Sequence, residues 1–310
     1  RPFFFLSYKC YKRDHPACFN PQHKTSFMSR FALPAVLLGA LILSTSAIFV
    51  RLSEVGPIAT GMYRMLLALP VFWLWMIADD QRSSHQDTHP KGLPRNPRDI
   101  LLVIVAGLFY AADLAVWHTS VGLTTVANAT ALGNTAPVFV AIASFVLFKE
   151  RITRLFFAGL VLAMAGTAVL IARSFTVSFD SVVGDALGLL TGVFYAGYIL
   201  TVARVRRRVS TSAVLAISGL TCGLILGLAA LILGEQFVPL TTAGWVWLFG
   251  LAYLCQLGGQ SLIIAALAYL PTNFGAVALL VQPIGTAIIG WIILSEAITI
   301  DKAIGIAAIL

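Results

Sequence analysis

The chain has 310 residues, of which 59 % are hydrophobic and 11 % are charged, and its net charge is +8. Soluble domains carry about 25 % charged residues, so this composition excludes an ordinary water-soluble protein. Apolar stretches of about 20 residues recur instead, the length of a helix that crosses a bilayer, and they exclude the short alternating strands of a membrane β-barrel. The sequence therefore predicts an all-α polytopic membrane protein.

The N-terminal segment differs from the rest of the chain. Residues 1–27 are basic, aromatic and proline-containing, and Met28 stands directly before the first apolar stretch. We therefore expect residues 1–30 to be a disordered tail or an extension foreign to the native protein. The Cys and His residues of this tail match no standard zinc pattern, so no metal or cofactor site is predicted.

Ten apolar stretches follow, and each is expected to form a membrane-spanning helix. They are Leu33–Leu52, Ile58–Ala78, Ile100–Ser120, Thr124–Phe148, Ile152–Ala172, Val182–Ala203, Thr211–Leu233, Thr241–Leu262, Asn273–Leu294 and a last stretch that opens near Ala303. Eight residues remain for the last stretch, so we expect the sequence to stop inside its final helix. The polar connection 79–99 is expected to be a flexible linker without a chemical role.

The sequence contains an internal repeat. Pro137, Glu150 and Gly159 recur 146 residues later, in the same order and at the same spacing. The later copies are Pro283, Glu296 and Gly305. Between Pro137 and Gly159, seven of 23 positions are identical at this offset. Such a repeat indicates a duplication, which divides the chain into residues 31–173 and 174–310 with five spans each. The two glutamates are expected to cap the helices that follow them.

Lysine and arginine are distributed unevenly over the connections between the spans. With the N-terminus in the cytoplasm, 17 of the 21 basic residues lie on the cytoplasmic side, so both termini are expected there. Because five spans is an odd number, the two halves insert with opposite topology. This inverted arrangement is common among secondary transporters, which open alternate sides by exchanging the conformations of their halves.

One base and one acid lie well inside the spans of the first half. At 1.5 Å per residue, Arg64 lies about 9 Å and Asp113 about 10 Å below the same outer edge. Because either charge alone is severely penalised in the membrane, the sequence predicts an ion pair between them. The pair either fixes helix packing alone or belongs to a transport path, where a zwitterionic substrate or a proton on Asp113 opens it.

Two neighbouring residues near the outer end of the same span carry aromatic rings. Trp117 shares a helical face with Asp113, four residues earlier, and is either an interfacial anchor or a ligand contact. His118 lies on a neighbouring face. It is either a proton carrier, since its pKa is near neutrality, or a histidine whose hydrogen bonds are satisfied at a helix end.

Proline interrupts two of the spans near the membrane centre. Asn134 lies three residues before Pro137, and Gln282 lies directly before Pro283. Each proline removes one backbone hydrogen bond and frees the carbonyl four residues earlier. The freed carbonyls are those of Gly133 and Leu279. Two kinked helices that meet at the midplane with amide side chains and free carbonyls predict a polar binding site.

Further polar residues fall at similar depths. Asn128 lies on a stripe of small and polar residues in the span of Asn134. Tyr195 lies in the sixth span together with Tyr198, and Gln256 lies in the eighth span together with Gln260. These side chains either hydrogen-bond neighbouring helices or line an uncharged cavity with aromatic walls.

The sequence lacks the motifs of common enzyme classes. It contains no HExxH, no GxSxG, no Walker loop and no GxGxxG beside a strand. Any pumping must therefore use an ion gradient, and the chain is expected not to be an enzyme.

At this point the residues resemble a known family. The run VANATALGNTAPVF before KER, the run VQPIGTAIIGWIILSE and Arg64 in YRMLLAL are similar to the two EamA repeats of the drug/metabolite transporter superfamily, in particular to a bacterial branch with ten spans. The resemblance covers about residues 33–310. It implies an inner-membrane exporter or importer of amino acids, metabolites or drugs, with a central cavity between the two halves.

The leading hypothesis is therefore a secondary transporter that exports an amino acid or a similar small metabolite through the bacterial inner membrane. Arg64 would hold a carboxylate, and Asp113 an amine or a proton. Uptake of a nucleoside-like metabolite or cofactor is an alternative, as is a membrane receptor or scaffold that transports nothing. The expected partners are the small-molecule substrate and the lipid bilayer, with proton coupling and a homodimer as further options and without nucleic acid.

Overall fold

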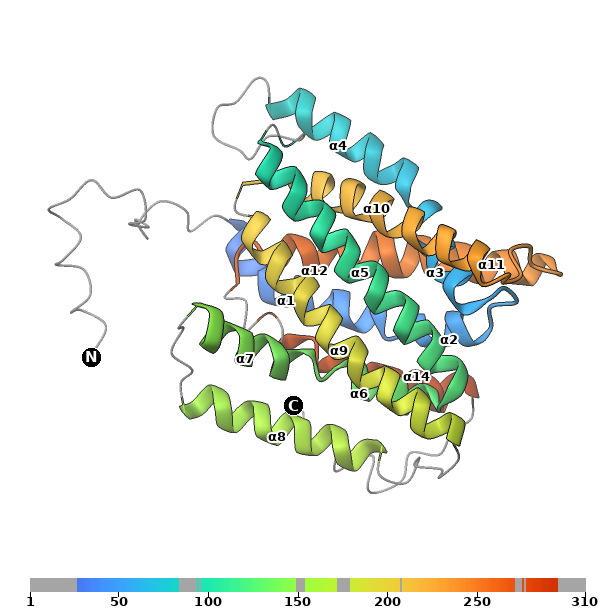
Figure 1. Ribbon diagram of the computed structural model, residues 1–310. Coiled ribbons are helices and arrows are strands. Elements are labelled where there is room, and N and C mark those ends of the chain that lie inside the picture. The colour runs from blue at the N-terminus through green and yellow to red at the C-terminus, as the bar shows by residue number, and fades with distance from the viewer. Residues whose placement is uncertain are drawn as a thin grey trace, which may run out of the picture.

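The structure, a computed structural model, describes residues 27–83, 94, 96–148, 154–171, 179–206, 208–270, 275 and 277–294, and its regular elements there are all helical (Figure 1). The helices are α1 (Phe27–Leu43), α2 (Ser46–Arg51), α3 (Pro57–Leu66), α4 (Leu69–Ser83), α5 (Pro97–Leu123), α6 (Val126–Gly133), α7 (Ala136–Phe148), α8 (Arg154–Ile171), α9 (Phe179–Val205), α10 (Thr211–Ile232), α11 (Thr242–Gly250), the π-helix η1 (Leu251–Gln260), α12 (Ser261–Ala266) and α14 (Val281–Leu294).

Six helical segments within these residues are long and apolar enough to cross a membrane. They are Phe31–Arg51, Pro57–Gln81, Pro97–Leu123, Phe179–Val205, Thr211–Ile232 and Thr242–Ala266. Three other expected spans fall on the shorter helices α6–α7, α8 and α14. The tenth stretch, Glu150 and Glu296 lie outside the described residues, so the count of ten spans stays a prediction.

Large apolar side chains cover the outer surface of the bundle. On α10, Leu224, Leu228 and Leu231 are each more than 60 % exposed and follow one another at helical spacing. A water-soluble protein rarely exposes such a continuous apolar stripe, whereas acyl chains cover it at no cost. The surface therefore agrees with a protein that is embedded in a bilayer.

Several helices are interrupted near their middle, and hydroxyl groups stand at the interruptions. Between α1 and α2, the hydroxyls of Ser44 and Thr45 donate to the carbonyls of Leu41 and Ile42, at 2.5 and 2.7 Å. Such local bonds compete with the backbone ladder and bend helices. Between α6 and α7, Thr135 donates in the same way to Leu132. The chain therefore places irregular backbone in the interior of the bundle.

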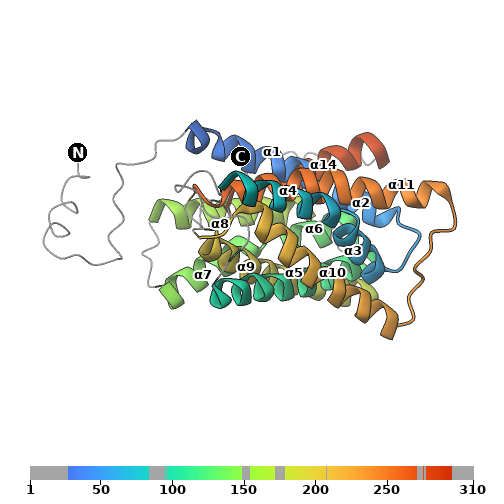
Figure 2. The same ribbon diagram turned by 90° about the horizontal axis from the view of Figure 1, so that it is seen from above.

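Helices of the two halves interleave. In the first half, α5 packs against α9 of the second half, and α1 packs against η1 and α12. The segment α3–α4 packs along α10, and α6 contacts α14. Figure 2 places α1 and α14 on one side of the bundle and α5 and α10 on the other. Each half of the chain thus completes the core of the other.

Close approach of α1 to η1 depends on a glycine. A Cβ atom at Gly39 would lie 2.7 Å from the carbonyl oxygen of Gly259, which is backbone and cannot rotate away. We therefore expect Gly39→Ala to lower the melting temperature of the purified protein markedly, since small residues let membrane helices pack closely. Gly122→Ala on α5 is the matched control, because a Cβ atom there meets nothing within 4 Å. Equal melting temperatures for the two variants would contradict the packing.

Candidate functional site

A cavity lies where the interrupted helices meet. Its empty volume is about 540 Å³, counted with the part that is open to solvent, and its walls come from both halves of the chain. Seven of the residues singled out in the sequence line it: Arg64, Asp113, Trp117, Asn134, Tyr195, Gln260 and Gln282. The lining residues extend from Leu43 to Thr286 along the chain and face one shared space.

The predicted ion pair between Arg64 and Asp113 is wrong for this structure. Arg64 is 4 % exposed, and its Nε donates to Gln256 Oε1 at 3.0 Å, while its Nη2 donates to the hydroxyl of Tyr110 at 3.3 Å. The Tyr110 hydroxyl in turn donates to Gln256 Oε1 at 2.8 Å. The side-chain oxygen of Gln256, on η1, therefore accepts the hydrogen bond from Arg64 that the Asp113 carboxylate was expected to accept.

Asp113 lines the same cavity without a partner of its own. Its side chain is 6 % exposed, and no hydrogen bond or ion pair joins it to another described residue. The cavity thus contains a buried guanidinium that is held by two neutral oxygens and a buried carboxyl group that no described residue holds. A ligand that carries both charges would complete both groups.

Three tyrosine rings stack behind Arg64. The rings of Tyr110 and Tyr198 lie 4.5 Å apart and are nearly parallel, at 11°, and Tyr195 stacks on Tyr198 at 6.0 Å. Tyr195 lines the cavity, whereas Tyr198 is buried and does not line it. Stacking of this kind fixes ring orientation, so Tyr198 supports the Tyr110 hydroxyl that holds Arg64.

The amides at the two proline-containing breaks meet. Asn134 Nδ2 donates to the carbonyl of Thr130 at 2.7 Å and reaches Gln282 Oε1 at 3.5 Å. Pro137 and Pro283 are buried near the beginnings of α7 and α14, where proline is tolerated. The expectation of a free carbonyl at Leu279 is wrong, because this oxygen accepts a hydrogen bond from the Gln282 N–H at 2.9 Å.

Besides Tyr198 and Gln256, two residues expected at the site do not line the cavity. His118 Nδ1 is 2.9 Å from the carbonyl oxygen of Pro57, so the ring ties α5 to the beginning of α3. Asn128 donates to Asp185 Oδ1 at 3.4 Å, an atom that also accepts from the Thr124 hydroxyl at 2.7 Å. Neither side chain lines the cavity. Asp185 escaped the sequence analysis because it stands at the edge of its predicted span.

Other lining residues were missed for want of a signal. Thr130, Thr191 and Thr286 face the cavity, but isolated threonines are common in membrane helices. Tyr110 was recognisable, since it lies one helical turn before Asp113 on the same face. The hydroxyls of Thr130, Thr191 and Tyr195 are buried without a hydrogen-bond partner. Buried polar atoms of native proteins nearly always have partners, so these three are available to a ligand.

Among the described residues, no three His, Cys, Asp or Glu side chains gather where they could hold a metal ion. The cysteines and histidines of the tail lie outside that part.

Comparisons with known proteins bear on the family. The model of the EamA-like transporter family matches residues 30–172 and again residues 182–310. A comparison with curated protein sequences gave no match. One crystal structure covers 91 % of this chain and 93 % of its own chain, with a TM-score of 0.70 and 18 % sequence identity, which shows a shared fold. Because the family model matches twice and spans most of the sequence, this multi-pass membrane protein belongs to the EamA-like transporter family.

Proposed function

We propose that the chain is a secondary active transporter that moves a small zwitterionic metabolite, such as an amino acid, by alternating access. In this proposal residues 31–173 and 174–310 are inverted five-span repeats, both termini lie in the cytoplasm of a bacterium, and the direction is export. The family supports transport of a small molecule. The zwitterionic substrate is supported by one observation, the unpaired Arg64 and Asp113 in a single cavity.

The polar side chains that line the cavity each have a role in this proposal. Arg64 takes the substrate carboxylate, since a guanidinium presents several donors to one carboxylate. Asp113 takes the amine, or a proton when the site is empty. Asn134, Gln260 and Gln282 offer amide groups to the rest of the polar headgroup.

A nucleoside-like substrate is the second candidate, and the aromatic lining favours it. Trp117 and Tyr195 both line the cavity, and rings of this kind stack on a heterocycle. An aromatic amino acid would use the same rings and also pair with Arg64 and Asp113. The need for both a carboxylate and an amine on the ligand therefore distinguishes an amino acid from a nucleoside.

A ligand screen tests the proposal. Purified protein is heated with each L-amino acid, with the matching decarboxylated amine and deaminated acid, and with nucleosides. We expect amino acids to raise the melting temperature and both single-charge analogues to fail, because loss of one buried charge contact costs about 2–5 kcal/mol.

Ligands that stabilise the protein are then used for counterflow in proteoliposomes, with and without a pH gradient. Stabilisation and counterflow by nucleosides alone would replace the leading substrate with the alternative. If compounds of the panel bind but none of them shows counterflow, the result would contradict transport and favour a receptor.

A further inference from the structure

The segment α3–α4 and the helix α10 pack against each other and run antiparallel (Figure 1). Hydrogen bonds tie them together at both ends. At the end where α3 begins, which we call the Glu54 face, Glu235 follows the last residue of α10 by three positions. Its carboxylate accepts hydrogen bonds from the backbone N–H groups of Ile58, at 3.3 Å, and Ala59, at 2.8 Å. An acid beyond α10 thus caps the first turn of α3.

The opposite end repeats this contact with the helices exchanged. At this end, which we call the Asp99 face, Asp79 stands near the end of α4. Its Oδ2 accepts a hydrogen bond from the hydroxyl of Ser212 at 2.5 Å, in the first turn of α10. An acid near the end of α3–α4 thus binds the beginning of α10, as the acid beyond α10 binds the beginning of α3.

A second contact is also repeated. At the Glu54 face, Glu54 stands three residues before α3 and accepts hydrogen bonds from the N–H of Thr241, at 2.8 Å, and from its hydroxyl. These bonds lower the pKa of the Glu54 carboxyl, and Thr241 is the N-cap of α11.

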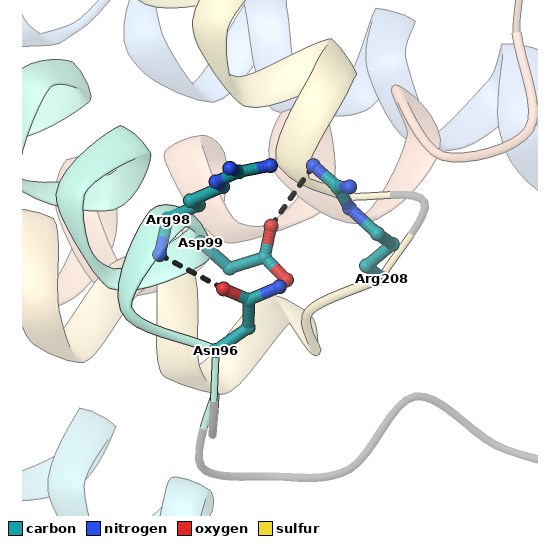
Figure 3. A network of polar contacts seen from close by, with 4 residues as sticks. All are labelled: Asn96, Arg98, Asp99 and Arg208. Carbon is teal, nitrogen blue, oxygen red and sulfur yellow. Dashed lines mark hydrogen bonds and ion pairs between the residues drawn. The ribbon is translucent and has the colours of Figure 1, made fainter.

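Its counterpart at the Asp99 face is an ion pair (Figure 3). Arg208 stands three residues before α10, and its Nη2 lies 2.9 Å from Asp99 Oδ1 in the first turn of α5. The contact is electrostatic and not a directed hydrogen bond, since this oxygen accepts none. The chemistry of the two faces differs, but the positions correspond.

Transport by inverted repeats places a condition on such contacts. The two access states differ by an exchange of the conformations of the two halves. A contact that opens in one state must therefore have a counterpart that is closed in that state. In this structure, each contact at the Glu54 face and its counterpart at the Asp99 face are both formed. If the two halves exchange their conformations, both contacts therefore remain formed.

The lining of the cavity agrees with this reasoning. No described residue of α4 or α10 lines it, and α3 contributes Arg64 alone, whereas α5 contributes four residues and α6 and α9 contribute two each. We propose that α3–α4 and α10, tied at both faces and held to the beginnings of α5 and α11, form the static unit of the transport cycle, around which other cavity-lining helices such as α6 and α9 move. The inference rests on the proposed alternating access.

Crosslinks across the two faces test the static unit. In protein without its four native cysteines, one variant carries Asp79→Cys with Ser212→Cys, and a second carries Ala59→Cys with Glu235→Cys. Each pair is closed by oxidation, and closure is checked by mass spectrometry. Both variants also carry Ser46→Cys in the cavity. This third cysteine has no second cysteine to form a disulfide with, so its thiol remains free for labelling. An impermeant maleimide is added to one side of sealed vesicles at a time.

A matched crosslink joins two helices that line the cavity. Thr124→Cys with Asp185→Cys ties the beginning of α6 to α9, where the native side chains already form a hydrogen bond. We expect the cysteine at position 46 to be labelled from both sides without a crosslink and with either crosslink of the static unit. Closure of the 124–185 pair is expected to reduce labelling from one side at least tenfold.

The outcomes separate the two ideas. If closing either static pair removes labelling from one side, that face is a gate and the static unit is refuted. If the protein without crosslinks is labelled from one side alone, alternating access fails, and the inference falls with it. Monodisperse elution of each variant shows that the fold is intact.

Discussion

Replacement of Arg64 by glutamine is expected to abolish counterflow and to weaken ligand binding by a factor of at least 30. Removal of one partner from a buried charge pair costs about 2–5 kcal/mol, and each 1.4 kcal/mol is a factor of about ten in affinity. Glutamine retains hydrogen-bonding capacity but carries no charge. The measurement is the ligand-dependent rise in melting temperature, followed by counterflow with the same compound.

Arg98→Gln is the control for this variant, because it removes an arginine that is exposed at the beginning of α5. It is expected to bind and transport as the parent protein does. If Arg64→Gln retained binding of the intact amino acid and lost only thermal stability, Arg64 would have a structural role alone. Arg64→Lys is informative as well, since an ammonium keeps the charge without the planar fork of a guanidinium.

Replacement of Gln256 by leucine is expected to give the largest loss of stability among the site variants. Gln256 Oε1 is the acceptor for both Arg64 Nε and the Tyr110 hydroxyl. Leucine has a similar volume and leaves both donors without that acceptor. Unsatisfied buried groups cost about 1–3 kcal/mol each, and more when charged. The melting temperature of the purified protein without ligand measures the effect.

Gln260→Leu provides the comparison within the same helix. Gln260 is also buried, but its Nε2 makes no hydrogen bond to a described residue, so its removal is expected to change the melting temperature far less. Tyr110→Phe should fall between the two, because it removes one donor and leaves Gln256 paired with Arg64. Equal losses for Gln256→Leu and Gln260→Leu would show that Gln256 does not organise Arg64.

Much of the architecture was predictable because hydrophobic length is a strong signal. The expected all-helical membrane class is confirmed by the helices and by the family, and the duplication around Pro137 and Pro283 agrees with two matches to one family model. The depth of a residue follows from its position along a helix, which is why Arg64, Asp113, Asn134 and Gln282 were found to face one cavity.

The pairing inside the cavity was not predictable in the same way. Depth does not give the rotation of a helix about its axis, and several acceptors lie at the depth of Arg64. The rotation of η1 is unusual as well, since a π-helix departs from the 3.6-residue period on which face assignments rest. Gln256 therefore reaches Arg64 in a way that its spacing from Gln260 did not reveal.

The separated charges of Arg64 and Asp113 have a kinetic consequence. In the proposed cycle an empty carrier holds a proton on Asp113 and must reorient with the desolvated guanidinium of Arg64 without an ion partner, whereas a loaded carrier reorients with both groups neutralised by its cargo. We expect the return of the vacant form to be the slow step of this cycle. We therefore expect one-for-one swapping of cargo across the bilayer to run faster than net flux down a gradient, so that the protein behaves as an exchanger.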